Sequence, residues 1–495
     1  MNIKQAKEEI KHTVMAYLAK DAQGEYRIPA IRQRPILLMG PPGIGKTQIM
    51  EQIAAECKIG LVAYTITHHT RQSAVGLPMI KEESFEGKTY SVTEYTMSEI
   101  IASIYRKMKK TGQKEGILFI DEINCVSETL APTMLQFLQC KTFGNQAIPE
   151  GWLIVAAGNP PEYNKSVRDF DMVTLDRVRY LNIEADYKVW KEYAREKHLH
   201  NAILSYLELR QKNFYRVEAD VDGIRFVTAR GWEDLSNLMQ VYEEMDLPVD
   251  EGVIREFIHH EDVAEDAAAY FELYRKYRDD YGITDILAGR IRPETFARIY
   301  AAAFDERLSV VNLLLDGLSA FFVKVQEKKK ITDNWYEFLK EYQRHLKEGE
   351  APADCYQALL EEKMAMVEAE KQAELCTKTQ AAGWEQIFAL WKENMPDKGL
   401  DAKESFAQAK TGFDIQREAL EESEQDASDA LEHAFDFMEH AFEDGEEMVV
   451  FVTELTLSPE AAMFLAEHTC ERYMTYNEQL LIGKRKRELL SELNR

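Results

Sequence analysis

The sequence lacks the features that mark several large classes of protein. It contains no CxxC pair and no metal-ligand spacing, and its six cysteines are scattered at positions 57, 125, 140, 355, 376 and 470. This pattern predicts buried free thiols in a reducing cytoplasm rather than a disulfide framework. The longest apolar stretch, 310–323, is interrupted by Asn312 and Asp316, so it is too polar to span a bilayer. The N-terminus turns polar at once, which excludes a visible signal peptide.

Basic charge is also scarce. The chain of 495 residues has 60 Lys and Arg against 86 Asp and Glu, a formal net charge of −26. A protein that coats nucleic acid needs clustered cations to bind phosphates, so this balance opposes that class without excluding a local basic groove. Apolar residues make up 45% of the chain and charged residues 29%, as in ordinary globular proteins. The length suggests roughly three domains.

Residues 31–185 carry the pattern of an α/β domain. Short apolar runs typical of strands alternate there with segments whose apolar residues recur at helical spacing. Because the runs are almost continuously apolar, they predict a parallel sheet covered by helices on both faces. The predicted strands are 36–39, 61–66, 117–120, 153–157 and 178–183.

The rest of the chain reads as helical. We expect an N-terminal helical segment over 1–30, a helical lid and extension over 186–330, and a mainly α-helical accessory domain over 331–495. The run 448–452 fits either a strand or a helix. Ser458 followed by Pro459 favours the start of a helix, because serine caps helices and proline is preferred in their first turn.

The strongest motif lies directly after the first predicted strand and directly before a predicted helix. It fits G-x-x-x-x-G-K-[ST] and reads Gly40-Pro41-Pro42-Gly43-Ile44-Gly45-Lys46-Thr47. Its glycines permit a backbone in which successive N–H groups surround a phosphate at the start of a helix. Lys46 is expected to reach the β- and γ-phosphates, and Thr47 to give its hydroxyl to Mg²⁺. The alternative is a glycine-rich turn with a chance Lys-Thr.

Two carboxylates end the third predicted strand. Asp121 follows the apolar run 117–120, which would place it beside the Mg²⁺ of the phosphate loop, and Glu122 is one residue further on. Glu122 is a candidate general base that polarises the attacking water. An apolar run that ends in Asp-Glu is weak alone, but the phosphate loop and this pair support each other.

These motifs resemble the AAA+ ATPases, and later ones are similar to the MoxR-like branch of that family. The segment Trp152–Pro160 resembles the sensor-1 strand, which implies that Asn159 holds the lytic water together with Glu122. The alternative for Asn159 is a turn former before two prolines. The resemblance covers about half of the chain, roughly 31–245.

Two arginines complete the resemblance. Arg177 stands where the family carries an arginine finger, although Val178 replaces its usual aromatic residue. Arg168 and Arg179 are the alternatives for this role, and a surface ion pair is the alternative for Arg177 itself. Arg230 lies where the sensor-2 helix begins, with Ala229 in place of the usual proline. The alternative for Arg230 is a surface arginine paired within its own helix.

The resemblance implies a Mg²⁺-dependent ATPase that forms a homo-oligomeric ring, most commonly a hexamer, and remodels a protein. Relatives in this branch act as chaperones, often beside a protein with a von Willebrand factor A domain. One alternative is a nucleic-acid motor subunit of a restriction or defence system, which would need a basic stripe that the sequence does not display. A second alternative is a regulatory switch that binds ATP without hydrolysing it. The presence of Glu122 and Asn159, the candidate residues for hydrolysis, argues against it. Adenine or guanine preference stays open.

Half of the net negative charge lies in one segment. Residues 414–447 contain 14 acidic side chains and one arginine, Arg417, with apolar residues at helical spacing. An amphipathic helix with a solvated acidic face is one interpretation. A docking surface for a basic partner is the other.

Overall fold

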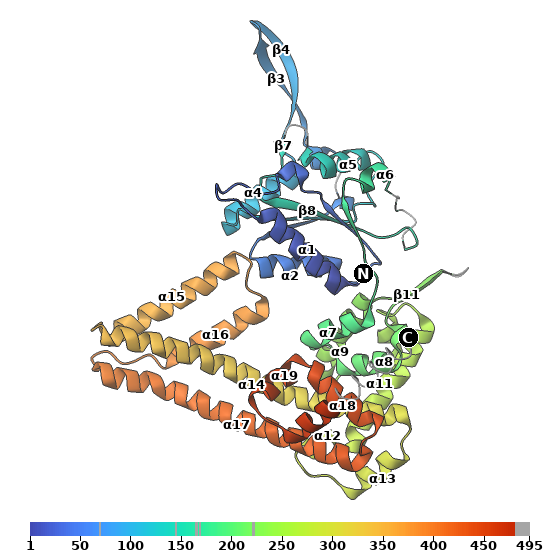
Figure 1. Cartoon of the computed structure of the whole chain (residues 1–495), viewed down its shortest axis with the longest axis vertical. Coiled ribbons are helices and arrows are strands. Elements are labelled where there is room, and N and C mark those ends of the chain that lie inside the picture. The colour runs from blue at the N-terminus through green and yellow to red at the C-terminus, as the bar shows by residue number, and fades with distance from the viewer. Residues whose placement is uncertain (69–70, 144–145, 164–166, 168–169, 220–222, 481–495) are drawn as a thin grey trace, which may run out of the picture. The chain divides into compact units, whose positions relative to one another are not determined.

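A computed structural model of the chain describes two compact units (Figure 1). Unit 1 comprises Met1–Val189, Thr228–Arg230 and Met366–Ala381, and unit 2 comprises Trp190–Val227, Gly231–Ala365 and Ala382–Arg495. The residues that the structure describes are 1–68, 71–143, 146–163, 167, 170–219 and 223–480.

A parallel sheet forms the centre of unit 1. In the described part of the chain it has five strands, in the order β2 (Gly60–Thr65), β5 (Gly116–Asp121), β8 (Trp152–Gly158), β1 (Ile36–Met39) and β9 (Arg179–Asn182). All residues of β1 and β8 are buried, as expected for inner strands with helices on both faces. The predicted α/β fold is confirmed, and each predicted strand ends within one residue of the observed one.

Helices cover the two faces of this sheet. The helices of unit 1 are α1 (Ile3–Leu18), α2 (Lys46–Cys57), α3 (Arg71–Val75), α4 (Glu99–Thr111), α5 (Ala131–Cys140) and α6 (Met172–Leu175). Ile104 of α4 and Phe137 of α5 share one buried cluster with Leu118 and Ile120 of β5. Helix α2 packs on β2 and β5 and also contacts α1. Alternate strand residues therefore face different helices, which explains why the strands are apolar throughout.

Two hairpins in unit 1 were not predicted. They are β3 (Pro78–Phe85) with β4 (Lys88–Tyr95), and β6 (Thr142–Phe143) with β7 (Gln146–Ala147). The first extends from the rest of unit 1 (Figure 1), and most of its side chains are exposed. Its strands have no buried face, and the short alternation at Tyr90 and Val92 of β4 was not recognised as a strand. Glu86 and Gly87, both with positive φ, form the two-residue turn that joins them.

Unit 2 is almost entirely helical. Its helices are α8 (Asn201–Leu209), α10 (Glu251–Arg255), α11 (Glu261–Tyr281), α12 (Ile283–Leu287), α13 (Pro293–Ala301), α14 (Phe304–Lys347), α17 (Ala402–Phe442), α18 (Glu446–Leu457) and α19 (Pro459–Glu467). The residues of four more helices are shared between the units: α7 (Tyr187–Glu196), α9 (Ala229–Glu244), α15 (Pro352–Gln372) and α16 (Lys378–Glu393). A short hairpin, β10 (Arg216–Ala219) and β11 (Ile224–Val227), departs from the helical pattern.

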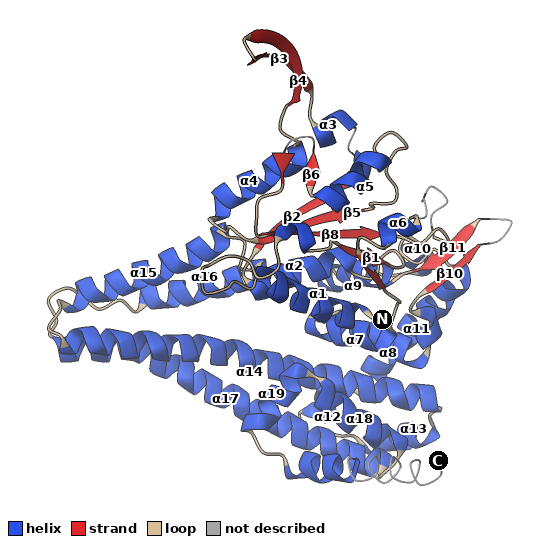
Figure 2. Ribbon diagram, turned by 45° about the horizontal axis from the view of Figure 1, so that its top comes forward, coloured by secondary structure: helices blue, strands red, loops and turns tan. Residues whose placement is uncertain are grey.

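The longest helices, α14 and α17, pack side by side (Figure 2). Large aromatic side chains are buried along α14, among them Trp335 and Phe338, and the Phe338 ring stacks on Trp391 of α16. The domain boundary expected at 331 falls inside α14. Residues 448–452 belong to α18, so the helical interpretation is right. Ser458 caps α19 as predicted, accepting the Ala461 N–H at 3.3 Å.

Helix α14 contains the longest apolar stretch noted in the sequence, residues 310–323. Within the described residues, α14 is the one single helix long and apolar enough to cross a membrane, and the pair α18 and α19, bent by 84°, meets the criterion together. Half of the apolar window of α14 is buried within the protein. A buried core helix satisfies the same criterion. All six cysteines are free, and the prediction of buried thiols is right for Cys355 and Cys470 but wrong for Cys140, which is exposed.

Candidate functional site

The phosphate-loop motif connects β1 to α2 as predicted. Gly43 and Gly45 have φ of 72° and 91°, in the left-handed region where a side chain would be strained. Helix α2 begins at Lys46, immediately after the loop, so the loop leads into the positive end of the helix. This geometry suits an anion bound by backbone N–H groups.

Lys46 is held at the centre of this loop. Its side chain is buried, and its ammonium donates to Gly40 O at 2.8 Å, to Pro41 O at 2.9 Å and to Asn159 Oδ1 at 2.8 Å. Burial lowers the Lys46 pKa to about 8, against a smaller opposing effect of Asp121. Residues 46 and 159, far apart in sequence, therefore meet at the carboxyl ends of two neighbouring strands.

Asp121 and Thr47 form the second part of the site. The Thr47 hydroxyl donates to Asp121 Oδ2 at 3.1 Å, so a hydroxyl and a carboxylate lie together beside the phosphate loop. Hard oxygen atoms of this kind are the ligands that Mg²⁺ prefers, with phosphate and water completing its coordination. The donor set fits the predicted metal.

Glu122 adopts an unusual backbone conformation for a residue with a side chain. Its φ is 57°, and its N–H donates to Asp121 Oδ1 at 2.9 Å. Its Oε2 accepts a hydrogen bond of 3.0 Å from the Thr67 hydroxyl. Left-handed conformations outside glycine are often kept at functional sites, where the surrounding contacts hold them. The two side chains therefore meet different partners, Asp121 the Thr47 hydroxyl and Glu122 the Thr67 hydroxyl, which is compatible with their different predicted roles.

Comparison with known proteins agrees with this geometry. Residues 36–172 match the family described as ATPase family associated with various cellular activities (AAA). This segment is therefore similar to AAA ATPase domains, and we refer to it as the AAA domain. A search of the curated proteins finds no match for the chain. The matched segment contains Lys46, Thr47, Asp121, Glu122 and Asn159, and it ends before Arg177 and Arg230.

Two polar residues of the AAA domain were missed by the sequence analysis. One is Thr67, the partner of Glu122, which follows the second strand. The other is Asn124, which is 3% exposed and donates from Nδ2 to the backbone oxygen of Asn159 at 2.8 Å. A polar residue near a strand end is a usable signal, but neither belongs to a motif. Thr67 orients the candidate base, and Asn124 orients the segment that carries Asn159.

Arg177 lies in unit 1, two residues after the end of α6, and its side chain is exposed. Its guanidinium contacts Gln139 of α5. Hydrogen bonds from Thr174 lower the pKa of the nearby Asp171 carboxyl, and the charge of Arg177 adds a smaller effect. Arg179, by contrast, is tied to α1 through Glu9 and through the Thr13 hydroxyl. Arg168 lies outside the described residues. Of the two described arginines, Arg177 is the freer to meet another molecule.

Arg230 lies against the phosphate loop. It is the second residue of α9, is exposed, and donates from its backbone N–H to Gly43 O at 3.1 Å. Its positive charge is also close enough to contribute to the lowered pKa of Lys46. The structure thus brings Arg230 to the same loop as Lys46, while Arg177 shares no hydrogen bond with that loop among the described residues.

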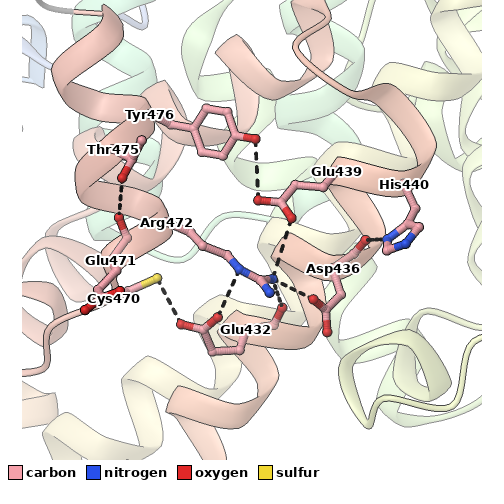
Figure 3. A network of polar contacts seen from close by, with 9 residues as sticks. All are labelled: Glu432, Asp436, Glu439, His440, Cys470, Glu471, Arg472, Thr475 and Tyr476. Carbon is pink, nitrogen blue, oxygen red and sulfur yellow. Dashed lines mark hydrogen bonds and ion pairs between the residues drawn. The ribbon is translucent and has the colours of Figure 1, made fainter.

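The acidic segment occupies most of α17, and part of its charge is balanced within the protein. Figure 3 shows Arg472 on the chain after α19 reaching three carboxylates of α17. Its guanidinium lies 3.5 Å from Glu432, 2.6 Å from Asp436 and 3.9 Å from Glu439. Neighbouring Cys470 also contacts Glu432, and burial raises the pKa of that thiol to about 11. Docking of a basic partner on the rest of α17 stays a prediction.

Proposed function

We propose that the chain is a MoxR-like AAA+ ATPase that hydrolyses ATP with Mg²⁺ and uses the energy to remodel a partner protein. The observation that carries the proposal is the meeting of Lys46, Thr47, Asp121 and Asn159 at one edge of the sheet, with Glu122 beside them. Each of these side chains has the chemical type that its step requires.

In this mechanism the loop backbone and Lys46 bind the β- and γ-phosphates, where phosphate oxygens replace the carbonyl oxygens that now accept from the ammonium. Thr47 and Asp121 would hold Mg²⁺, which would supply positive charge to neutralise the phosphates. Glu122 takes a proton from the attacking water, and Thr67 keeps its carboxylate in place. Asn159 orients that water through its side-chain amide.

The proposal includes a ring of identical subunits, most simply a hexamer. AAA domain proteins commonly form oligomeric rings. In such a ring, exposed Arg177 would stabilise negative charge on a neighbour's transferring phosphoryl group, and Arg230 would contact the nucleotide of its own subunit. The segment 186–330 would then act as a lid, and 331–495 as the accessory region that meets the partner in the cytoplasm. A protein with a von Willebrand factor A domain is the partner we propose.

The test is affinity capture with Glu122→Gln, which should hold ATP and trap the ring with its partner. Glu150→Gln serves as the matched control, because Glu150 is exposed and precedes β8, at the end of the strand opposite Asn159. We expect a specific protein with Glu122→Gln and ATP, and none with Glu150→Gln or without ATP. Mass photometry should show the ring. Recovery of nucleic acid without a specific protein would favour the nucleic-acid motor instead.

A further inference from the structure

Unit 2 contains a cavity, lined by both polar and apolar side chains, that the ATPase mechanism does not use. Its volume is about 470 Å³, within the range of small-molecule sites. Side chains from several helices line it, including Lys191 and Arg195 of α7, Asn312 and Asp316 of α14, and Glu454 of α18. Because these segments are far apart in sequence, the cavity exists only in the folded helical unit.

The walls carry an excess of negative charge. Among the described residues, the lining includes five carboxylates, three Lys or Arg side chains and two histidines. The cations are engaged. Lys191 pairs with Glu208 and lies 3.0 Å from Glu454, and Arg195 also pairs with Glu454. Arg278 lies 3.8 Å from Glu243. The negative charge of the five carboxylates therefore exceeds the positive charge of the three Lys and Arg side chains.

Of the five lining carboxylates, Asp316 and Glu460 form no ion pair with a Lys or Arg among the described residues, and Glu460 lies 3.9 Å from His198 instead. Among the described residues the hydrogen bond to Asp316 comes from the neutral Tyr274 hydroxyl. Asp316 lines the cavity and keeps part of its surface accessible. Burial nevertheless raises its pKa to about 7, with Tyr274, Arg195 and Arg278 opposing the shift. A cation that enters the cavity would stabilise the ionised form of this carboxylate, because a buried charge without a partner is unfavourable.

The floor of the cavity is held by neutral hydrogen bonds. Asn312 donates to Ser205 at 2.8 Å, Ser205 is 2.6 Å from the Tyr270 hydroxyl, and Tyr270 is 2.9 Å from Ser309. Two of these residues, Ser205 and Asn312, also line the cavity. Buried partners therefore hold Ser205 and Asn312 in place before any ligand arrives. Binding then costs less side-chain entropy, because these side chains are already ordered.

The arrangement favours an organic cation over a metal ion. A metal site needs several ligand atoms that converge on one point. Among the described residues, the one convergent group of three such side chains is His345, Glu348 and Glu350, which are not part of the cavity. The volume also far exceeds that of a single ion.

We propose that this cavity binds a small organic amine, with its ammonium group against Asp316 and its carbon chain along Leu313 and Leu315. The ammonium supplies the cationic hydrogen-bond donors that Asp316 lacks. The site is separate from the nucleotide site, and the proposal does not depend on ATP hydrolysis.

The test is calorimetric titration of the full chain at pH 8 with n-butylamine and 1,4-diaminobutane. Butan-1-ol and butyrate serve as a neutral and an anionic probe of similar size. We expect the amines to bind at least tenfold more tightly than the alcohol, and butyrate not to bind. Equal affinity for alcohol and amine, or binding of butyrate alone, would overturn the proposal.

Variants locate the binding. Asp316→Asn should weaken the amines at least tenfold, whereas Glu337→Gln, an exposed change on the same helix, should leave their affinity unchanged. Tyr274→Phe keeps the carboxylate and should retain binding. Unchanged amine affinity in Asp316→Asn contradicts the assignment. If that variant does not fold, the comparison of amine with alcohol on the unaltered chain decides.

Discussion

The nucleotide site of unit 1 and the cavity of unit 2 both gather charged side chains, but from different kinds of segment. In unit 1, Lys46 follows the loop after β1, Asp121 ends β5 and Asn159 follows β8. Because these three strands are neighbours in one parallel sheet, they deliver the three side chains to one edge. In unit 2, Lys191, Asp316 and Glu454 come from three separate helices. In a parallel sheet, residues at the ends of neighbouring strands come together directly, so short sequence motifs predict the site. In a helical unit, a site forms only where the packing of several helices brings distant residues together.

The largest expected effect separates the chemistry of the two regions. Glu122→Gln removes the candidate base, so ATP turnover should fall at least about 100-fold while ATP binding persists. Asp316→Asn should leave turnover within about twofold at saturating ATP. Steady-state hydrolysis and nucleotide-binding assays measure both. Unaltered turnover in Glu122→Gln would remove the mechanism proposed here.

A smaller effect is expected where a residue acts through another. Thr67→Val removes the hydroxyl that donates to Glu122 at 3.0 Å, and turnover should fall roughly tenfold, the value of one hydrogen bond to a charged group. Thr67→Ser keeps the hydroxyl and should restore most of the rate, with the KM for ATP unchanged in both variants. Equal turnover rates in Thr67→Val and Thr67→Ser would show that the hydrogen bond from Thr67 does not position Glu122.

The next prediction concerns stability rather than catalysis. Because burial raises the Asp316 pKa to about 7, its ionised form is disfavoured in the folded protein. This destabilisation is complete above pH 7 and is lost as the pH falls toward the pKa of the unfolded chain. Asp316→Asn should therefore raise the melting temperature of unit 2 by a few degrees at pH 8 and by less at pH 5.

Scanning calorimetry at the two pH values measures this difference. Glu337→Gln is the control and should give the same small change at both pH values, since Glu337 is exposed. A melting temperature of Asp316→Asn that is lower than that of the unaltered chain at pH 8 would contradict the assignment of a buried, unbalanced carboxylate.

The smallest effect is expected at the acidic helix. Arg472→Ala removes a guanidinium that meets three carboxylates, but its side chain is 36% exposed, so solvent screens the pairs. We expect a loss of about 0.5–1 kcal/mol at low salt, and less at high salt. Arg417→Ala, whose side chain meets Glu421 alone among the described residues, should cost less. Denaturant titration at two salt concentrations compares them.

The phosphate loop shows how far the sequence could predict the site. A loop that joins an apolar strand to a helix has few possible conformations, and glycines at 43 and 45 take the two left-handed positions. The positions of Asp121 and Asn159 were also predictable, because Asp121 ends one buried strand and Asn159 follows another. Thr67 and Asn124 were not, since nothing local distinguishes them from other polar residues near strand ends.

The helical unit shows the opposite case. The sequence predicted helices after 186, but the length of α14 and the helical state of residues 448–452 were not decided by local pattern. The hairpin of β3 and β4 was missed because its strands are mostly exposed and lack the near-continuous apolar runs of the buried sheet, although Tyr90 and Val92 alternate with polar residues.

The sequence by itself determined the α/β class, the five strands of the sheet and the nucleotide motif, because hydrophobic period and glycine geometry act within a few residues of chain. Only the tertiary structure decided that Thr67 contacts Glu122, that Arg472 meets three carboxylates of α17, and that Asp316 lines a cavity without a Lys or Arg ion pair of its own. Those contacts join residues far apart in sequence. Their energies depend on burial and on opposite charges, which chain position does not specify.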